Sequence, residues 1–307
     1  MKKILVLLLL IPFATSAQQF SLVKDFNNEV TSNGHDPENG GVVWNNLFIY
    51  AAKAQSCGLE PWVSDGTADG TQLLKDIRPG VGFSEPEDFA ITPNGVVFSA
   101  YSVELGRELY ITEGTPEGTQ LLIDLYPGET SSSAAGMITF NDHAYFSAFH
   151  PEINGTAIYR TDGTAEGTEL FFDDNGVGSV GFIQAFVWNE KLFLSITSTG
   201  NGTEPWVTDG TEEGTMLLLN IAPGTDSSNP GLFTPFGEDL IFRAYSSSVG
   251  NEPYITDGTP EGTTLLKNIN SGSGNSMVDS FVELKGELLF SAQDASSRQV
   301  WKTDGTV

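Results

Sequence analysis

Six carboxylates, each at the start of an Asp-Gly-Thr or Glu-Gly-Thr triplet, are the residues whose type and spacing best suit chemistry. They are Asp65, Glu113, Asp162, Asp209, Asp257 and Asp304. Such a turn can offer oxygen ligands to calcium, with a neighbouring carboxylate, such as Glu166, Glu213 or Glu261, as a second oxygen donor. In the structural alternative, the aspartate caps the turn and the glycine adopts a positive φ. Because every copy carries the triplet, we predict the structural role, with calcium as the alternative cofactor and no metal residue assigned.

No other residues form a pattern typical of a catalytic or cofactor-binding site. The histidines, His35, His143 and His150, lack the spacing of metal ligands, and the last two flank one predicted strand. There is no G-x-S-x-G sequence, P-loop or Rossmann fingerprint. Cys57 is the single cysteine, which excludes an intramolecular disulfide and indicates a free thiol. We therefore assign no catalytic and no cofactor-binding residue.

The arginines are distributed along the chain, at most one to a repeat. They are Arg78, Arg107, Arg160, Arg243 and Arg298. A site for a substrate carboxylate usually needs arginines in a cluster, because the guanidinium group binds carboxylates with two parallel hydrogen bonds. We expect no such cluster here.

The triplets recur at a nearly constant interval, which indicates a repeat protein. Successive copies are 48, 49, 47, 48 and 47 residues apart. An aromatic residue stands three positions before each acid, at Trp62, Tyr110, Tyr159, Trp206, Tyr254 and Trp301. Each repeat contains up to four short apolar runs bounded by Gly, Pro, Asn and Asp, for example 231–236, 240–245, 252–256 and 263–269. Units of this length with four antiparallel strands are typical of β-propeller blades, so we predict an all-β propeller with the four runs ordered from the axis outward.

The second run of each repeat contains a phenylalanine, which predicts how the strands face the core. These residues are Phe48, Phe98, Phe146, Phe193, Phe242 and Phe290. Two positions later stands a small residue in five copies, namely Ala100, Ala148, Ser195, Ala244 and Ala292, whereas the first copy has Tyr50. Since alternate residues of a strand share a face, we expect a large ring and a small side chain on the same side, as a tapering closed array requires.

The phase of the repeats predicts six blades and a closed ring. Complete units lie near 40–77, 86–125, 135–173, 180–221 and 230–269, and a sixth has runs at 277–284, 286–293 and 298–304. Residues 20–26 resemble the fourth runs, so we expect this N-terminal strand to complete the C-terminal blade and to leave no open sheet edge there. The competing interpretation is a fragment of a longer protein with further blades.

The N-terminus predicts the localisation of the protein, and the charge balance indicates which partners are disfavoured. Residues 1–17 combine Lys2 and Lys3, an apolar run and a small-residue stretch, which is the pattern of a signal peptide. The domain is then 18–307, a single propeller without a membrane span. The net charge of −26, from 14 Lys plus Arg against 40 Asp plus Glu, argues against nucleic acid and anionic membranes as partners.

The combined motif, E-L/P-W/Y-x-x-D-G-T followed by x-x-G-T-x-L-L-x-D-I and P-G, resembles the ELWxxDGT repeat family of bacterial exported proteins. The resemblance extends over nearly all of 20–307, with departures at Glu113, Ala157 and Gln299. It implies a secreted or cell-surface protein with a β-propeller-like fold, and it brings no catalytic residues.

Variable polar loops, such as 130–133 and 225–228, recur at one place in the repeat and suit binding. We therefore expect a monomeric, non-catalytic binding or adhesion scaffold for an extracellular protein or glycan. The alternative is a carbohydrate-active or other hydrolase with its site at the channel mouth, since glycoside hydrolysis needs only a pair of carboxylates.

Overall fold

The computed structural model describes residue 23 and residues 40–173 and 179–306, and this part of the chain is built from strands alone. It forms six antiparallel sheets, five of four strands and one of three. The predicted all-β class is confirmed, and each of the six sheets corresponds to one repeat, while the number of blades in a closed ring stays a prediction. No helix long and apolar enough to cross a membrane occurs in the described ranges. The predicted signal peptide and nearly all of the predicted strand at 20–26 lie outside them.

Each sheet contains the consecutive strands of one repeat. Sheet 1 contains β1 (Gly41–Trp44), β2 (Leu47–Ala54), β3 (Gly58–Ser64) and β4 (Gln72–Leu73), and sheet 2 contains β5 (Glu87–Thr92), β6 (Gly95–Ser102), β7 (Gly106–Thr112) and β8 (Gln120–Ile123). Sheet 3 contains β9 (Ala135–Phe140), β10 (His143–His150), β11 (Gly155–Thr161) and β12 (Glu169–Phe172), and sheet 4 contains β13 (Gly181–Trp188), β14 (Lys191–Ser198), β15 (Gly202–Thr208) and β16 (Met216–Leu217). Sheet 5 contains β17 (Gly231–Phe236), β18 (Asp239–Ser246), β19 (Gly250–Thr256) and β20 (Thr264–Leu265), and sheet 6 contains β21 (Asp279–Leu284), β22 (Glu287–Gln293) and β23 (Arg298–Thr303).

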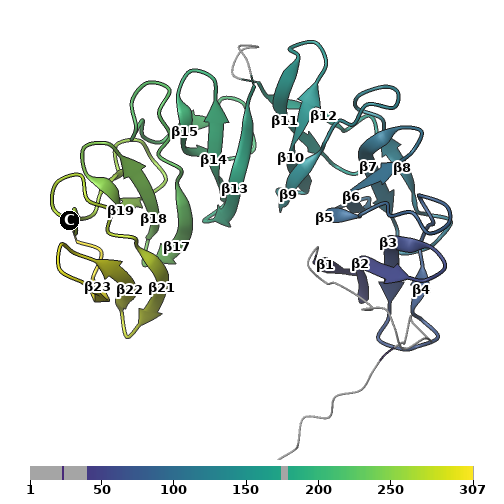
Figure 1. The fold of residues 1–307 in the computed structure, drawn as a ribbon, viewed down its shortest axis with the longest axis horizontal. Helices are drawn as coiled ribbons and strands as arrows, with labels where there is room; N and C mark the ends of the chain where they lie inside the picture. Colours follow the sequence, from purple (N-terminus) through teal and green to yellow (C-terminus); the bar gives the residue numbers. More distant parts are fainter. Residues whose placement is uncertain (1–22, 24–39, 174–178, 307) are drawn as a thin grey trace, which may run out of the picture.

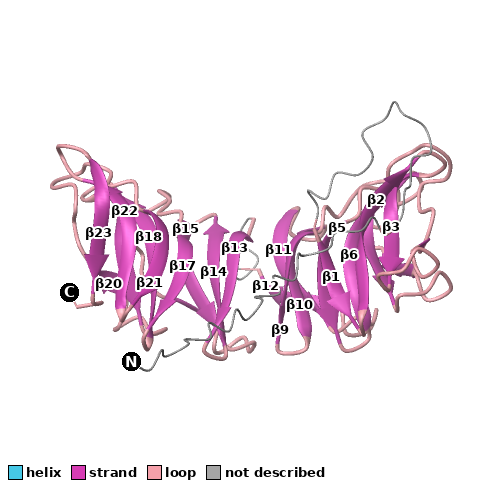
Figure 2. Cartoon of the chain, turned by 90° about the horizontal axis from the view of Figure 1, so that it is seen from below, coloured by secondary structure: helices cyan, strands magenta, loops and turns pink. Residues whose placement is uncertain are grey.

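The six sheets stand side by side in an arc, with the first strand of each on the concave side (Figure 1). First strands of neighbouring sheets contact one another from β1 to β5 and onward to β21. The second to fourth strands follow outward in chain order, as predicted. Figure 2 shows the same sheets from below, packed face against face. This arrangement is propeller-like.

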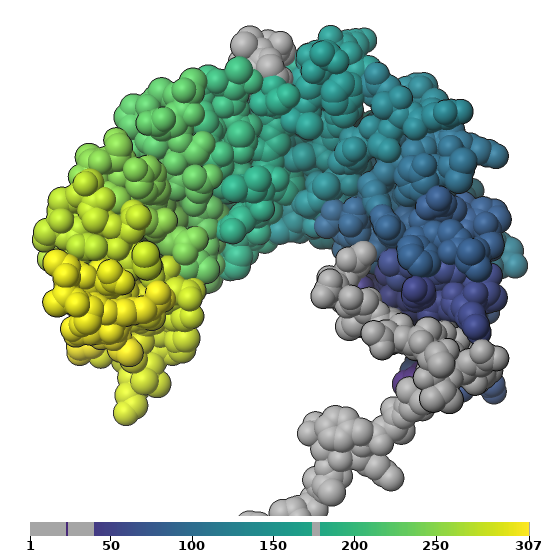
Figure 3. All heavy atoms as spheres, viewed as in Figure 1, coloured from purple at the N-terminus to yellow at the C-terminus, as the bar shows by residue number. Residues whose placement is uncertain are grey.

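The structure does not show the closed ring that the sequence predicts. Sheets 1 and 6 lie at the two ends of the arc, with open space between them (Figure 3). Sheet 6 has three strands in the described part of the chain. On its outer face Val300 is 77% exposed, whereas the equivalent Leu109 and Ile158 are fully buried, because those two are covered by the next sheet along the arc. Closure by residues 20–26 stays a prediction.

Each pair of neighbouring sheets shares an apolar core. Between sheets 3 and 4, for instance, Tyr145 and Ile158 pack with Leu192, Leu194 and Trp206. Similar clusters join sheets 1 and 2, 2 and 3, 4 and 5, and 5 and 6. A single antiparallel sheet cannot bury both of its faces, so each sheet depends on its neighbours for stability.

The predicted phenylalanine pattern is wrong in the first and fourth repeats. The cross-strand register places Tyr50 opposite Trp62 and Leu194 opposite Trp206, as Phe98 lies opposite Tyr110. The large side chain opposite the aromatic residue of the motif is therefore Tyr50 in the first repeat and Leu194 in the fourth. A shift by one residue moves a side chain to the other face of the strand, and Phe193 accordingly packs on the opposite face, in the cluster with sheet 5.

With the register corrected, the small position is more regular than the sequence suggested. It holds Ala52, Ala100, Ala148, Ala244 and Ala292, and in sheet 4 Ile196. All six side chains are buried. The expected pairing of a phenylalanine and a small residue is confirmed in the second, third, fifth and sixth repeats, and the first repeat has the equivalent pair of Tyr50 and Ala52.

Candidate functional site

The Asp-Gly-Thr triplets form a closed set of hydrogen bonds within their own turn. In the fourth repeat, the Asp209 Oδ1 atom accepts bonds from the backbone N–H of Thr211 at 2.8 Å and from its hydroxyl at 2.7 Å. The Thr211 hydroxyl oxygen accepts the N–H of Gly214 at 2.9 Å. Gly210 has a φ of 95°, which glycine adopts at no steric cost. The hydrogen bonds to Thr211 lower the pKa of Asp209.

The same bonds recur at Asp65, Asp162, Asp257 and Asp304. The predicted structural role is confirmed for the five aspartates, and in the second repeat, which has Glu113, the glycine of the triplet keeps its positive φ of 77°. In the described ranges no group of three or more His, Cys, Asp or Glu side chains could hold a metal ion. The dependence on calcium stays a prediction.

A second glycine, three residues after the threonine of the triplet, is required for space. A Cβ atom at Gly214 would lie 2.1 Å from the Asp209 Oδ1 atom. We expect Gly214→Ala to lower the free energy of unfolding by roughly 1–3 kcal/mol, because the capping carboxylate must move. The matched control is Gly200→Ala, since a Cβ atom there meets nothing within 4 Å. Thermal denaturation of both variants checks this, and equal melting temperatures would contradict it.

The leading glutamate of the motif is the feature whose role the sequence did not reveal. Glu60, Glu108, Glu204 and Glu252 are fully buried. In the fourth repeat, the Glu204 Oε2 atom accepts the backbone N–H of Ile221 at 3.0 Å and the Ser228 hydroxyl at 2.7 Å, and Oε1 accepts the N–H of Ala222 at 3.0 Å. Ile221 follows β16, and Ser228 lies in the segment that enters sheet 5. One carboxylate therefore fixes the end of one sheet to the start of the next.

The glutamate and its serine change together among the repeats of this chain. The pairs are Glu60 with Ser84, Glu108 with Ser132, Glu204 with Ser228, and Glu252 with Ser276. In the third repeat Ala157 and Val180 occupy these two positions, and both are fully buried. The Val180 N–H still donates to the Thr156 carbonyl, as the Ser228 N–H donates to Thr203. In the third repeat, two apolar side chains therefore replace the glutamate and the serine, and the backbone hydrogen bond between the two segments is kept.

Burial is the main influence on these carboxyl groups. It raises the pKa of Glu60 to about 7, against the opposing effect of its hydrogen bonds from Ser84 and Ile77. It also raises the pKa values of Glu108, Glu204 and Glu252. A raised carboxyl pKa often marks a catalytic acid, but here each carboxyl of this set accepts hydrogen bonds from the end of its own sheet and from the segment that enters the next one. We therefore assign it to the fold.

His143, His150 and Cys57 lie where the sequence predicts, and His35 lies outside the described residues. His143 and His150 are the first and last residues of β10, and His150 stacks on Tyr159 with ring centroids 6.0 Å apart. Cys57 is free and buried, and burial raises the pKa of its thiol. The thiolate is the nucleophilic form, so this environment does not favour a catalytic cysteine.

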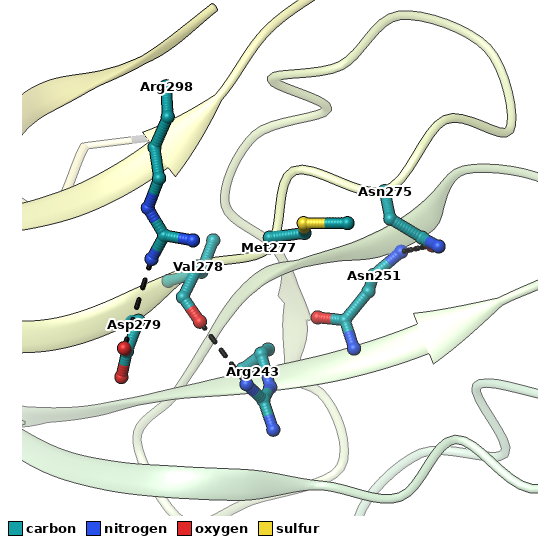
Figure 4. A pocket seen from close by; sticks show the side chains of 7 residues that line it. All are labelled: Arg243, Asn251, Asn275, Met277, Val278, Asp279 and Arg298. Atoms are coloured by element: carbon teal, nitrogen blue, oxygen red, sulfur yellow. Dashed lines mark hydrogen bonds and ion pairs between the residues drawn. The ribbon is translucent and has the colours of Figure 1, made fainter.

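Two of the five arginines line one cavity, which corrects the expectation of dispersed arginines. Arg243 in β18 and Arg298 at the start of β23 are brought together between sheets 5 and 6, although 55 residues separate them in the sequence. Figure 4 shows both side chains at this cavity of about 350 Å³. Its other lining residues are Asn251, Asn275, Met277, Val278 and Asp279. No sequence motif marks it, because its residues come from four strands and a connecting segment.

The cavity contains polar groups that have no partner among the residues that the structure describes. Buried Arg243 Nε and Asn251 Oδ1 make no hydrogen bond. The Arg243 Nη1 atom donates to the Val278 carbonyl at 3.3 Å, and the Arg298 Nη2 atom lies 3.8 Å from Asp279 Oδ2. In sheet 2, by contrast, Arg107 is held by Glu87 at 2.8 Å and Glu85 at 3.1 Å. Buried polar groups are normally paired, so unpaired ones in a cavity indicate a place for a ligand or water.

Comparison with known proteins gives likenesses of structure alone. No family model matches this chain, and no curated protein matches its sequence. Solved structures that are similar include puromycin hydrolase, with 13% identity and a TM-score of 0.45 over 87% of this chain and 44% of that one. One of two prolyl endopeptidases has 11% identity and a TM-score of 0.48, over 86% and 40%. Pyrococcus horikoshii acylaminoacyl peptidase has 11% and 0.42, over 85% and 44%. The chain spans less than half the length of each of these proteins.

Proposed function

We propose that this chain is an exported, non-catalytic β-propeller of the ELWxxDGT repeat kind that binds an extracellular glycan or protein. The observation that supports this proposal most is the distribution of the polar groups. The turn aspartates and the buried glutamates of the motif accept hydrogen bonds from the backbone and side chains that they hold in place. By contrast, the buried Arg243 Nε and Asn251 Oδ1 atoms have no partner among the described residues, and both residues line a cavity. The motif carboxylates thus serve the scaffold, and the cavity is the place that suits a ligand.

A binding screen and a turnover assay test the function together. The purified protein is applied to a glycan array and to immobilised extracellular proteins, and the same preparation is incubated with a panel of polysaccharides and peptides. We expect saturable binding to at least one ligand and no product formation. Turnover of a polysaccharide without retained binding would favour the hydrolase alternative. A chelator added in both assays measures any dependence on calcium.

We also propose that the ring closes through residues 20–26 in the six-bladed form. Two observations support this: sheet 6 has no fourth strand among the described residues, and residues 22–26 match the fourth run of the first repeat, 73–77. Since Trp62 lies opposite Leu73, the equivalent pair would be Leu22 and Trp301. In a Cys57→Ser background, we expect Leu22→Cys with Trp301→Cys to form a disulfide under oxidation. The pair Leu22→Cys with Trp206→Cys is the control, and equal cross-linking of both pairs would contradict closure.

A further inference from the structure

We infer that the cavity between sheets 5 and 6 binds the carboxylate of a uronic acid residue at the end of a glycan. The inference rests on the proposed binding function and names its ligand class. The cavity is lined by Arg243, Asp279 and Arg298 as charged residues, so two cations face one anion. The whole chain has a net charge of −26, whereas the charged side chains of this cavity sum to +1. An anionic group is favoured there because arginine donates charge-assisted hydrogen bonds to carboxylates.

The state of the two guanidinium groups shows that donors remain available. Arg243 uses Nη1 for the Val278 carbonyl, while its buried Nε has no partner. Arg298 donates through Nε to the Ser291 hydroxyl at 2.6 Å and keeps Asp279 at the longer distance of 3.8 Å. A ligand carboxylate that replaced this long contact would gain hydrogen bonds and would leave the Asp279 carboxylate to solvent. Binding of the anion therefore completes bonds that the protein leaves unmade.

The remaining walls of the cavity favour a sugar over an apolar ligand. Asn251 and Asn275 contribute amides, and the Asn275 Oδ1 atom accepts the backbone N–H of Asn251 at 2.9 Å, which fixes the two residues relative to each other. The Asn251 Oδ1 atom is buried without a donor, so a ligand hydroxyl would satisfy it. Figure 4 shows these amides on one side of the cavity and Arg298 with Asp279 on the other. A ligand with a carboxylate at one end and hydroxyls at the other matches this order.

The size and the overall charge restrict the ligand further. A volume of about 350 Å³ is at the lower end of the range for small-molecule pockets, which suits one sugar ring. Long polyanions are disfavoured, because the negative charge of the whole protein repels them while only one cationic pocket attracts them. A single terminal uronic acid on a short chain avoids this repulsion.

Calorimetric titration with trigalacturonate and with its methyl ester tests the inference. Esterification removes the charge and leaves the hydroxyls, so we expect binding of the acid and at least roughly tenfold weaker binding of the ester, as for a lost charge-assisted bond. Arg243→Gln and Arg298→Gln should each weaken binding of the acid to a similar degree. Lys75→Gln makes the same change of net charge at an exposed residue of the first repeat and should leave binding unchanged.

Three further results of these titrations would contradict the carboxylate site or the choice of a sugar as the ligand. Equal binding of acid and ester, or full affinity in Arg243→Gln, would overturn the carboxylate site while leaving the proposed binding function intact. Tighter binding of a short oligoaspartate than of trigalacturonate would overturn the sugar in favour of an acidic peptide. If Arg243→Gln does not fold, as judged by circular dichroism, Arg243→Lys keeps the charge but loses the two-bonded geometry and should bind the acid more weakly than the parent chain.

Discussion

Replacing Glu204 by alanine is expected to destabilise the protein by roughly 3–5 kcal/mol, the scale seen when one partner of a buried polar network is removed. The side chain is fully buried and accepts hydrogen bonds from Ile221, Ala222 and Ser228. Its loss leaves these donors buried without an acceptor and opens a cavity at the junction of sheets 4 and 5. Denaturant unfolding followed by the fluorescence of the nearby Trp206 measures the effect.

The third repeat supplies a control for this prediction. Ala157 and Val180 are its natural apolar pair, so Glu204→Ala with Ser228→Val copies that pair into the fourth repeat. We expect the double variant to recover part of the lost stability, because the orphaned hydroxyl is removed and the valine fills space. Recovery stays partial, since the N–H groups of Ile221 and Ala222 remain unpaired. A cost below about 1 kcal/mol for Glu204→Ala alone would show that water satisfies these donors and that the pair does not join the sheets.

The protein is expected to be more stable in mild acid than at neutral or alkaline pH. Burial raises the pKa values of four glutamates in the folded state, that of Glu60 from 4.5 to about 7. The folded state therefore binds protons that the unfolded state has released. This stabilisation is fully present below about pH 4.5 and is lost as the pH rises through the folded pKa, near 7 for Glu60.

The turn aspartates set the lower limit of this window. Hydrogen bonds from the threonine two residues on lower the pKa values of Asp65, Asp209 and Asp257 below 3.8. Their contribution is fully present above about pH 3.8 and is lost as the pH falls through the folded pKa. The two sets together place maximum stability at about pH 4–5, and unfolding in denaturant measured from pH 3 to pH 8 checks it. A free energy of unfolding that increased from pH 5 to pH 8 would contradict the prediction.

Substitution of Glu60 measures the contribution of this one carboxyl group to the dependence of stability on pH. The shift of Glu60 from 4.5 to about 7 corresponds to about 3 kcal/mol between mild acid and alkaline pH. Glu60→Gln does not titrate, so the decline of stability with pH should be smaller by about that amount. Glu117→Gln removes an exposed acid of the second repeat and should leave the profile unchanged. A profile identical to that of the parent chain in Glu60→Gln would assign the decline to general charge repulsion.

The role of the triplet was predictable from sequence, because all of its interactions are local. Asp209, Thr211 and Gly214 lie within six residues, so their types and spacing already contain the turn that they form. The role of Glu204 was not predictable, since its partners Ile221 and Ser228 lie 17 and 24 residues away. The recurrence of serine before each first strand, and its replacement by Val180 where Ala157 replaces glutamate, was the signal that could have found the pair.

Sequence alone determined the repeat, the number of units and the order of strands within each sheet, because these follow from periodic turns and from contacts inside one unit. It misplaced the large residue in repeats 1 and 4, since Phe48 and Phe193 fit the apolar pattern as well as Tyr50 and Leu194 do and only the pairing with the next strand distinguishes them. Only the tertiary structure showed the arc-shaped stacking of the described sheets and the meeting of Arg243 with Arg298. Both depend on how one sheet packs against another, and packing between sheets joins residues that no local spacing relates.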